Sequence, residues 1–253
     1  MLLGTHMGMK FVGARIRRRE DAALLCGAGC FTDDLRLDGT LVATFVRSEF
    51  AHARIASIDL TAARAMPGVV GIWTAADLPQ PLRGKTLPIW VPTHTMAQAR
   101  GFPPLARDEA TYVGEPIAVV VAESRYLGED AVDAIAINYE PLPAVVDCRA
   151  AAAPSSPTAH AQAKDNIAAR FTVEYGDVDA AFANAQVIVR AEFRLHRGLC
   201  QAMEGRAVLA WFDASTNKLT LWSAGQTPHF IKRMLVETLE LDDEHVRVIT
   251  PNV

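Results

Sequence analysis

The final stretch of the chain, residues 219–253, constrains the fold most, because strand-like and helix-like patterns follow one another there without a break. Apolar residues run through 219–222 and again through 246–249, as in short buried strands. Between these runs, apolar residues recur at helical spacing over 230–239. Gln226 lies in the turn after the first run, at the strand end where α/β arrangements present residues to ligands. We therefore expect Gln226 to be a candidate ligand-binding residue.

The first half of the chain contains strand-like runs separated by short helical stretches. Residues 41–47 are apolar and β-rich, and residues 52–59 alternate as their expected antiparallel partner. Ser124 is placed to cap a helix over 125–134. The remaining strand-like runs are 69–73, 117–122 and 135–139. This pattern predicts two β–α–β units on one mixed sheet within residues 11–147.

The second half begins with a segment poor in large apolar residues, which predicts a linker at 148–166. Beyond it we expect short strands at 171–175 and 187–195, with a helix between them that Asp177 caps. Runs at 208–212 and 219–222 predict a hairpin with Asn217 near its turn. The fold class expected for the chain is α+β.

Composition excludes some functions and locations. The formal net charge of −4 gives no reason to expect nucleic acid as a partner. No apolar run approaches the ~20 residues of a membrane span. The first ten residues, MLLGTHMGMK, lack the features of a signal peptide, so we interpret residues 1–19 as an N-terminal arm that includes a possible tag remnant.

Several individual residues could carry chemistry, but each has a simpler interpretation. Cys26 and Cys30 have a spacing that zinc sites use, yet no second Cys/His pair follows, so the four cysteines are expected to be free buried thiols in a reducing cytoplasm. His52 could act as a base, although a histidine between strands is more often structural. Arginines between positions 15 and 19 are expected to be a solvated face. The proline-rich residues 79–104 predict a long loop that could contact a partner.

Three groups of motifs together resemble the molybdenum-binding large subunit of the xanthine oxidase and aldehyde oxidase family. The resemblance is strongest to the carbon monoxide dehydrogenase-like branch. It covers nearly all of residues 11–253. The motifs that carry it are GAGCFTDD with RSEFAHARI, then VGEPIAVVVA with YEPLPAVVD, and lastly MEGR (203–206) with QTPH (226–229).

The resemblance implies an a/b hammerhead domain at residues 20–147 and the beginning of a first molybdopterin-binding domain at 167–253. It implies that Gln226 lies beside a molybdenum–molybdopterin cofactor and hydrogen-bonds its ligands, because an amide both donates and accepts without adding charge. No residue of this chain is expected to ligate the metal, and no FAD or iron–sulfur cluster is expected in it. Glu204 is expected to be a structural acid, since buried acids need partners.

Family resemblance also implies the partners. They are the remainder of the molybdenum subunit, an iron–sulfur subunit, an FAD subunit and a small-molecule substrate. The carboxylate that acts as general base is expected outside this chain, so the chain alone is not expected to turn over substrate. The alternative is a non-catalytic docking or assembly module for the other subunits, with residues 79–104 as its contact surface.

Overall fold

The structure is a computed structural model that describes residues 13–87, 95–98, 101–195, 198, 201–202 and 204–252. The chain divides into two compact units. The larger unit comprises Leu37–Leu199 with Thr238–Glu240, and the smaller unit comprises Met1–Arg36, Cys200–Glu237 and Leu241–Val253. In the described residues, no helix combines the length and the apolar character that crossing a bilayer requires.

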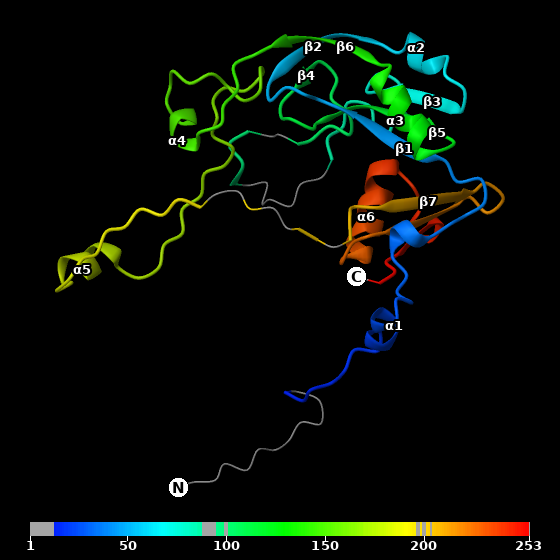
Figure 1. Ribbon diagram of the computed structural model, residues 1–253. Coiled ribbons are helices and arrows are strands. Elements are labelled where there is room, and N and C mark those ends of the chain that lie inside the picture. Colours follow the sequence, from blue (N-terminus) through cyan, green and yellow to red (C-terminus); the bar gives the residue numbers. More distant parts are fainter. Residues whose placement is uncertain are drawn as a thin grey trace. The chain divides into compact units, whose positions relative to one another are not determined.

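The larger unit contains two three-stranded sheets, ordered β1–β5–β3 and β4–β2–β6, in which every pairing is antiparallel (Figure 1). Its elements in chain order are β1 (Val42–Arg47), β2 (Ala53–Asp59), α2 (Thr61–Arg64), β3 (Val69–Thr74), β4 (Glu109–Ala110), β5 (Pro116–Ala122), α3 (Arg125–Asp133), β6 (Ala136–Pro141), α4 (Cys148–Ala151) and α5 (Val178–Ala183).

The expectation of one mixed sheet is therefore wrong, and so is the pairing expected between 41–47 and 52–59. β1 pairs with β5, in a register that sets Phe45 opposite Val119, whereas β2 pairs with β4 and β6. The sequence patterns predicted the strands of this unit other than β4, but alternation within a strand does not show which strand it pairs with. The continuous apolar run of β5 instead places it at the centre of its sheet, between β1 and β3.

The core of the larger unit is centred on β5. Ile117 and Val120 are its largest fully buried side chains, and they belong to two adjacent apolar clusters. Helix α3 packs on β1 and β5, and Ser124 caps it by accepting the Leu127 N–H at 3.3 Å, as predicted. Gly128 lets α3 approach β1 closely, since a Cβ at that position would overlap the Thr44 side chain.

Residues 171–195 contain one short helix, α5 (Val178–Ala183), and the structure, which describes this whole segment, contains no strand there. The strands expected at 171–175 and 187–195 are therefore wrong. Asp177 does cap α5, accepting the Ala180 N–H at 2.9 Å. The alternating apolar side chains are exposed, and they are Phe171, Val173, Tyr175, Val187, Val189, Phe193 and Leu195. Alternation alone cannot make a strand, because a strand also needs a neighbour for its backbone hydrogen bonds.

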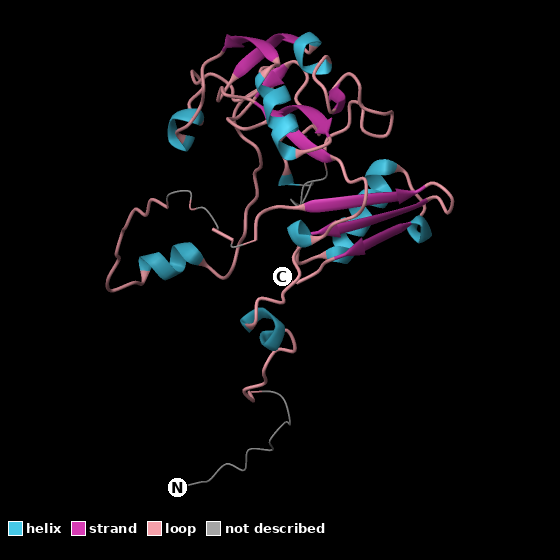
Figure 2. Ribbon diagram, turned by 45° about the vertical axis from the view of Figure 1, so that its right-hand side comes forward, coloured by secondary structure: helices cyan, strands magenta, loops and turns pink. Residues whose placement is uncertain are grey.

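The smaller unit is built on a three-stranded sheet of order β7–β8–β9 (Figure 2). Strands β7 and β8 form the predicted hairpin, with Asn217 in its turn at φ 54°. Strand β9 runs parallel to β8, which requires the crossover connection that α6 provides. The elements in chain order are α1 (Asp21–Leu25), η1 (Thr32–Asp34), β7 (Val208–Asp213), β8 (Lys218–Ser223), α6 (Pro228–Leu239), η3 (Asp243–His245) and β9 (Val246–Ile249).

The turn of this hairpin is held by Asp213. Its carboxylate accepts from the Ser215 hydroxyl at 2.6 Å and from the Thr216 hydroxyl at 2.7 Å. These hydrogen bonds, first from Ser215 and then from Thr216, lower the pKa of Asp213 below its ordinary value. The turn thus fixes the register of β7 against β8. Gln226, which is described next, follows the end of β8.

Candidate functional site

The carboxyl ends of β8 and β9 meet at one edge of the sheet of the smaller unit. In the parallel register, Trp222 lies opposite Ile249, so the segments that follow the two strands begin at neighbouring positions. The segment after β8 is the turn that carries Gln226, and the segment after β9 is Thr250–Asn252. Such an edge is where ligands bind in sheets with parallel strands.

Gln226 lies in a short turn whose two ends are fixed by backbone hydrogen bonds. Before it, the Ala224 N–H donates to the Ala207 carbonyl at 3.0 Å, which continues the β7–β8 pairing by one residue. After it, the Ile231 N–H donates to the Thr227 carbonyl at 3.0 Å and begins α6. Gln226 is exposed, and its side chain has no hydrogen-bond partner among the described residues. Its amide is therefore available to a group outside this chain segment.

The segment after β9 is tied to a loop from the beginning of the chain. The Cys30 N–H donates to the Asn252 side-chain oxygen at 2.7 Å, and the Asn252 N–H donates to the Cys30 carbonyl at 3.0 Å. Cys30 belongs to the GAGCFTDD motif, which turns at Gly27 (φ 70°) and ends in η1. This motif therefore packs at the end of β9.

Glu204 holds the same loop. Its Oε1 accepts the N–H of Thr32 at 3.2 Å, and Thr32 is only 2% exposed. The carboxylate thus satisfies a buried backbone donor, which agrees with the structural role expected for it. Met203, its neighbour in the MEGR motif, lies outside the described residues.

Sequence reasoning did not find the group formed by Cys30, Thr32 and Asn252. Cys30 and Asn252 are 222 residues apart, and no spacing rule connects them. The hydroxyls of Thr32 and Thr250 are both buried without a hydrogen-bond partner in the part of the chain that the structure describes. The only sequence signal was that both segments fall within stretches that carry the family resemblance or directly follow them.

The described residues contain no group of three or more His, Cys, Asp or Glu side chains that could hold a metal ion. Cys26, Cys30 and Cys148 are free and exposed, so the expectation of buried thiols is wrong for these three. Cys200 lies outside the described residues. Among the described residues at the sheet edge, the exposed neutral amide of Gln226 suits hydrogen bonding to a bound group.

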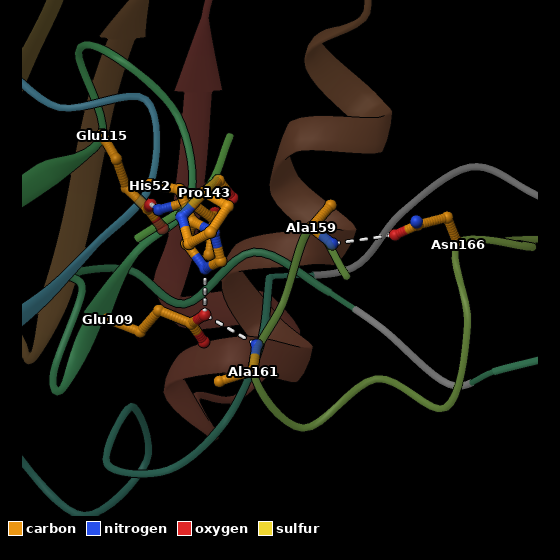
Figure 3. Close-up of polar contacts among 8 residues, drawn as sticks. His52, Glu109, Glu115, Pro143, Ala159, Ala161 and Asn166 are labelled. Atoms are coloured by element: carbon orange, nitrogen blue, oxygen red, sulfur yellow. Dashed lines mark hydrogen bonds and ion pairs between the residues drawn. The ribbon is translucent and has the colours of Figure 1, made fainter. Parts of the chain in front are cut away.

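The other candidates from the sequence do not join this edge. The arginines at 15–19 are exposed, and Arg18 pairs with Asp21 at 2.9 Å, as expected of a solvated face. His52 belongs to the larger unit, where it is buried and both ring nitrogens have partners (Figure 3). A ring held in this way supports the structural interpretation of His52. Of the proline-rich segment, residues 88–94 and 99–100 lie outside the described residues.

Two family models match the chain. Residues 26–143 match the aldehyde oxidase and xanthine dehydrogenase a/b hammerhead domain. Residues 159–253 match a molybdopterin cofactor-binding domain, and this match contains Gln226 and Thr250–Asn252. The chain thus has the order predicted from the sequence, an α+β hammerhead domain followed by part of a molybdopterin-binding domain.

Curated relatives agree with these matches. The chain is 40% identical over 241 residues to the nicotine 6-hydroxylase large subunit of Paenarthrobacter nicotinovorans, covering 95% of this chain and 29% of the relative. It is 35% identical over 258 residues to the carbon monoxide dehydrogenase large chain of Afipia carboxidovorans, covering 96% and 30%. The chain therefore spans less than a third of the length of these relatives.

Solved structures give the same result. Quinoline 2-oxidoreductase from Pseudomonas putida 86 superposes with a TM-score of 0.83 at 36% identity, covering 94% of this chain and 30% of that one. The Cu,Mo-CO dehydrogenase superposes with a TM-score of 0.81 at 34% identity, covering 95% and 31%. Fold, motifs and relatives define a molybdopterin-dependent oxidoreductase class. The chain belongs to the xanthine dehydrogenase and aldehyde oxidase family of molybdenum hydroxylase large subunits.

Proposed function

We propose that this chain is a portion or a split subunit of a molybdenum hydroxylase, in which Gln226 hydrogen-bonds the ligands of the molybdenum cofactor. The observation that carries the proposal is the position of Gln226. It is an exposed amide without a partner among the described residues, at the carboxyl end of β8, inside the molybdopterin-binding match. A neutral side chain that donates and accepts can orient a polar group without changing the charge of the site.

The residues at this edge fit such a cofactor as hydrogen-bonding neighbours. Backbone hydrogen bonds on either side of Gln226 hold its backbone at the strand end before the ligand arrives, which reduces the ordering that binding requires. When bound, the cofactor would supply the redox chemistry by which water-derived oxygen enters a small substrate and two electrons leave. The contribution of this chain is to position the cofactor and hydrogen-bond it. The pairing of Cys30, in the GAGCFTDD loop, with Asn252 restrains the neighbouring strand end.

The complete enzyme would need further polypeptide. We propose that the partners are the remainder of the molybdenum subunit, an iron–sulfur subunit and an FAD subunit, acting together in the cytoplasm. The exposed alternating apolar residues of 171–195 favour an assembled state, because such a set is normally covered by a partner surface. The same observation also favours a docking module that binds the other subunits without contributing to chemistry.

Reconstitution separates these functions. The chain is purified alone and then mixed with a separately expressed remainder of the subunit, and molybdenum content and turnover are measured in both samples. We expect no stoichiometric molybdenum in the chain alone, and molybdenum with turnover in the mixture. Stoichiometric molybdenum in the chain alone overturns the proposal, and binding without turnover supports the docking module.

The role of Gln226 is tested in the same mixture. Gln226→Ala should lower turnover by about a hundredfold, the order of the loss when one preorganised hydrogen-bond donor is removed. It should also change the visible spectrum of the bound cofactor. Gln162→Ala is the matched control, since Gln162 is likewise exposed in a turn but belongs to the larger unit. Equal behaviour of the two variants would falsify the role of Gln226 while leaving the assembly proposal standing.

A further inference from the structure

A buried histidine contacts the end of the hammerhead match. His52 is 6% exposed and directly precedes β2, and its Nδ1 lies 2.8 Å from the carbonyl oxygen of Pro143, the last residue of that match. Its Nε2 lies 2.6 Å from Oε1 of Glu109, on the adjacent strand β4 (Figure 3). The histidine thus connects a strand of the hammerhead fold to the segment that leaves it.

The partners of the ring determine its protons. A carbonyl oxygen only accepts, so Nδ1 must carry a proton to bond Pro143. The second hydrogen bond needs another proton, either on Nε2 or on the carboxyl of Glu109. The Ala161 N–H donates to the same Oε1 at 2.7 Å, and an oxygen that accepts twice is best an ionised carboxylate. Oε1 of Glu109 is thus the shared atom that joins the His52 ring to the Ala161 backbone.

Ala161 belongs to the segment predicted as a linker, and it is the third residue of the molybdopterin-binding match. The segment is extensively hydrogen-bonded. Asn166 closes it internally, accepting the Ala159 N–H at 2.8 Å and donating to the Pro157 carbonyl at 2.9 Å. Gln98 holds it from outside, accepting the Lys164 N–H at 3.1 Å. The segment that Glu109 contacts is therefore held in a defined conformation by its own hydrogen bonds.

We propose that His52 and Glu109 form a latch that holds the beginning of the molybdopterin-binding match against the end of the hammerhead match. The pair bonds Pro143 on one side and Ala161 on the other, so a single dyad holds the end of one match and the beginning of the next.

Other ionisable groups lie on the elements around the pair and are accounted for separately. Glu115, at 3% exposure, accepts from the amide and hydroxyl of Thr111. Arg54 on β2 pairs with Glu140 on β6 at 3.3 Å, where both are exposed. Burial, and then the charge of Glu49, raises the pKa of Tyr139. Further ionisable residues on these elements include Asp108 beside β4, and His160, Lys164 and Asp165 in the held segment.

The latch is tested by amide hydrogen exchange on the full chain. Protection of the Ala161 amide is compared with that of β5, whose protection reports the core. Glu109→Ala should lower protection at Ala161 by roughly ten- to a hundredfold, as expected for a charge-assisted hydrogen bond, and leave β5 unchanged. Unchanged protection at Ala161, or an equal loss in β5, overturns the proposal.

Glu109→Gln is the conservative variant. At the position of Oε1 its amide can present either an acceptor to Ala161 or a donor to the ring, and not both, so protection at Ala161 should fall, by less than in Glu109→Ala. If Glu109→Ala yields no folded protein, Glu109→Gln decides the matter, and unchanged protection at Ala161 in that variant rejects the proposal. This latch does not depend on the function proposed for Gln226.

Discussion

The side-chain oxygen of Asn252 accepts the backbone N–H of Cys30 at 2.7 Å, and the Asn252 N–H donates to the Cys30 carbonyl at 3.0 Å. These two residues are 222 positions apart, yet they pair as closely as residues of one turn. The pair ties the GAGCFTDD loop to the strand end beside the Gln226 turn. Because Asn252 bonds both the backbone N–H and the backbone carbonyl of Cys30, it holds these two segments of the smaller unit together.

Removal of the Asn252 side chain should loosen this loop. Asn252→Ala deletes the acceptor of the Cys30 N–H and should cost about 1 kcal/mol of unfolding free energy, the typical net value of one hydrogen bond. Hydrogen exchange of the Cys30 amide measures the effect locally. Asn252→Asp is the control, since it retains an oxygen at the same position. Equal protection of Cys30 in the two variants would show that the side chain does not hold the loop.

Much of the architecture could be predicted because individual helices, strands and turns have signals in their own local sequence. The cap at Ser124, the hairpin through Asn217 and the helix before β9 each follow from residues within one turn or one strand. The family and its α+β order followed from motifs in sequence order. Gln226 was also found locally, from its position directly after a strand, and its contact with a cofactor stays a prediction.

The sequence could not show which distant segments contact or pair with one another. The pattern of 52–59 is satisfied equally by any strand that covers its apolar face, and the structure pairs it with β4 and β6. Residues 187–195 have the alternation of a half-buried strand, but their large apolar side chains are exposed and the structure pairs them with no strand. The prediction that the cysteines are buried was wrong for a similar reason, because composition does not show whether any other segment covers Cys26 or Cys30.

Gly128 should be required for the packing of α3. A Cβ there would overlap Thr44, so Gly128→Ala should lower the unfolding free energy by about 1–2 kcal/mol, as overpacked sites do. Helix propensity alone favours alanine by ~1 kcal/mol, so a net loss reports the clash. Chemical denaturation measures it, and Thr44→Ala in the same chain should restore most of the loss. Gly205→Ala, in open space, is the control. A stabilised Gly128→Ala would contradict close packing at this position.

Asp77 should titrate below its ordinary range because of Thr74. The Thr74 N–H and hydroxyl donate to Oδ2 of Asp77 at 2.8 and 2.7 Å, and the backbone bond is the first cause that lowers the pKa of Asp77. A lowered folded-state pKa gives stability that is present above the unfolded value and is lost as pH falls through the folded one.

Thr74→Val removes the hydroxyl and keeps the amide, so the pKa of Asp77 should rise partway toward its usual value. Carboxyl-carbon NMR titration follows Asp77, with Asp213 as the internal control, since its own hydroxyl donors are unchanged. An Asp77 titration that is identical in wild type and variant would show that the hydroxyl has no part in the shift.

The exposed apolar residues of 187–195 should drive self-association of the isolated chain. Val189 is 83% and Phe193 is 86% exposed, and alternating apolar residues with unpaired backbone favour edge-to-edge association. Val189→Glu with Phe193→Glu should therefore shift the chain toward the monomer in size-exclusion chromatography with light scattering. Gln186→Glu with Thr172→Glu adds the same charge at exposed polar positions and should leave association unchanged. Equal dissociation by both pairs would assign the effect to charge instead of apolar contact. A further polypeptide would stabilise the chain by covering these same side chains. Val189→Glu with Phe193→Glu should therefore weaken reconstitution while it improves solubility.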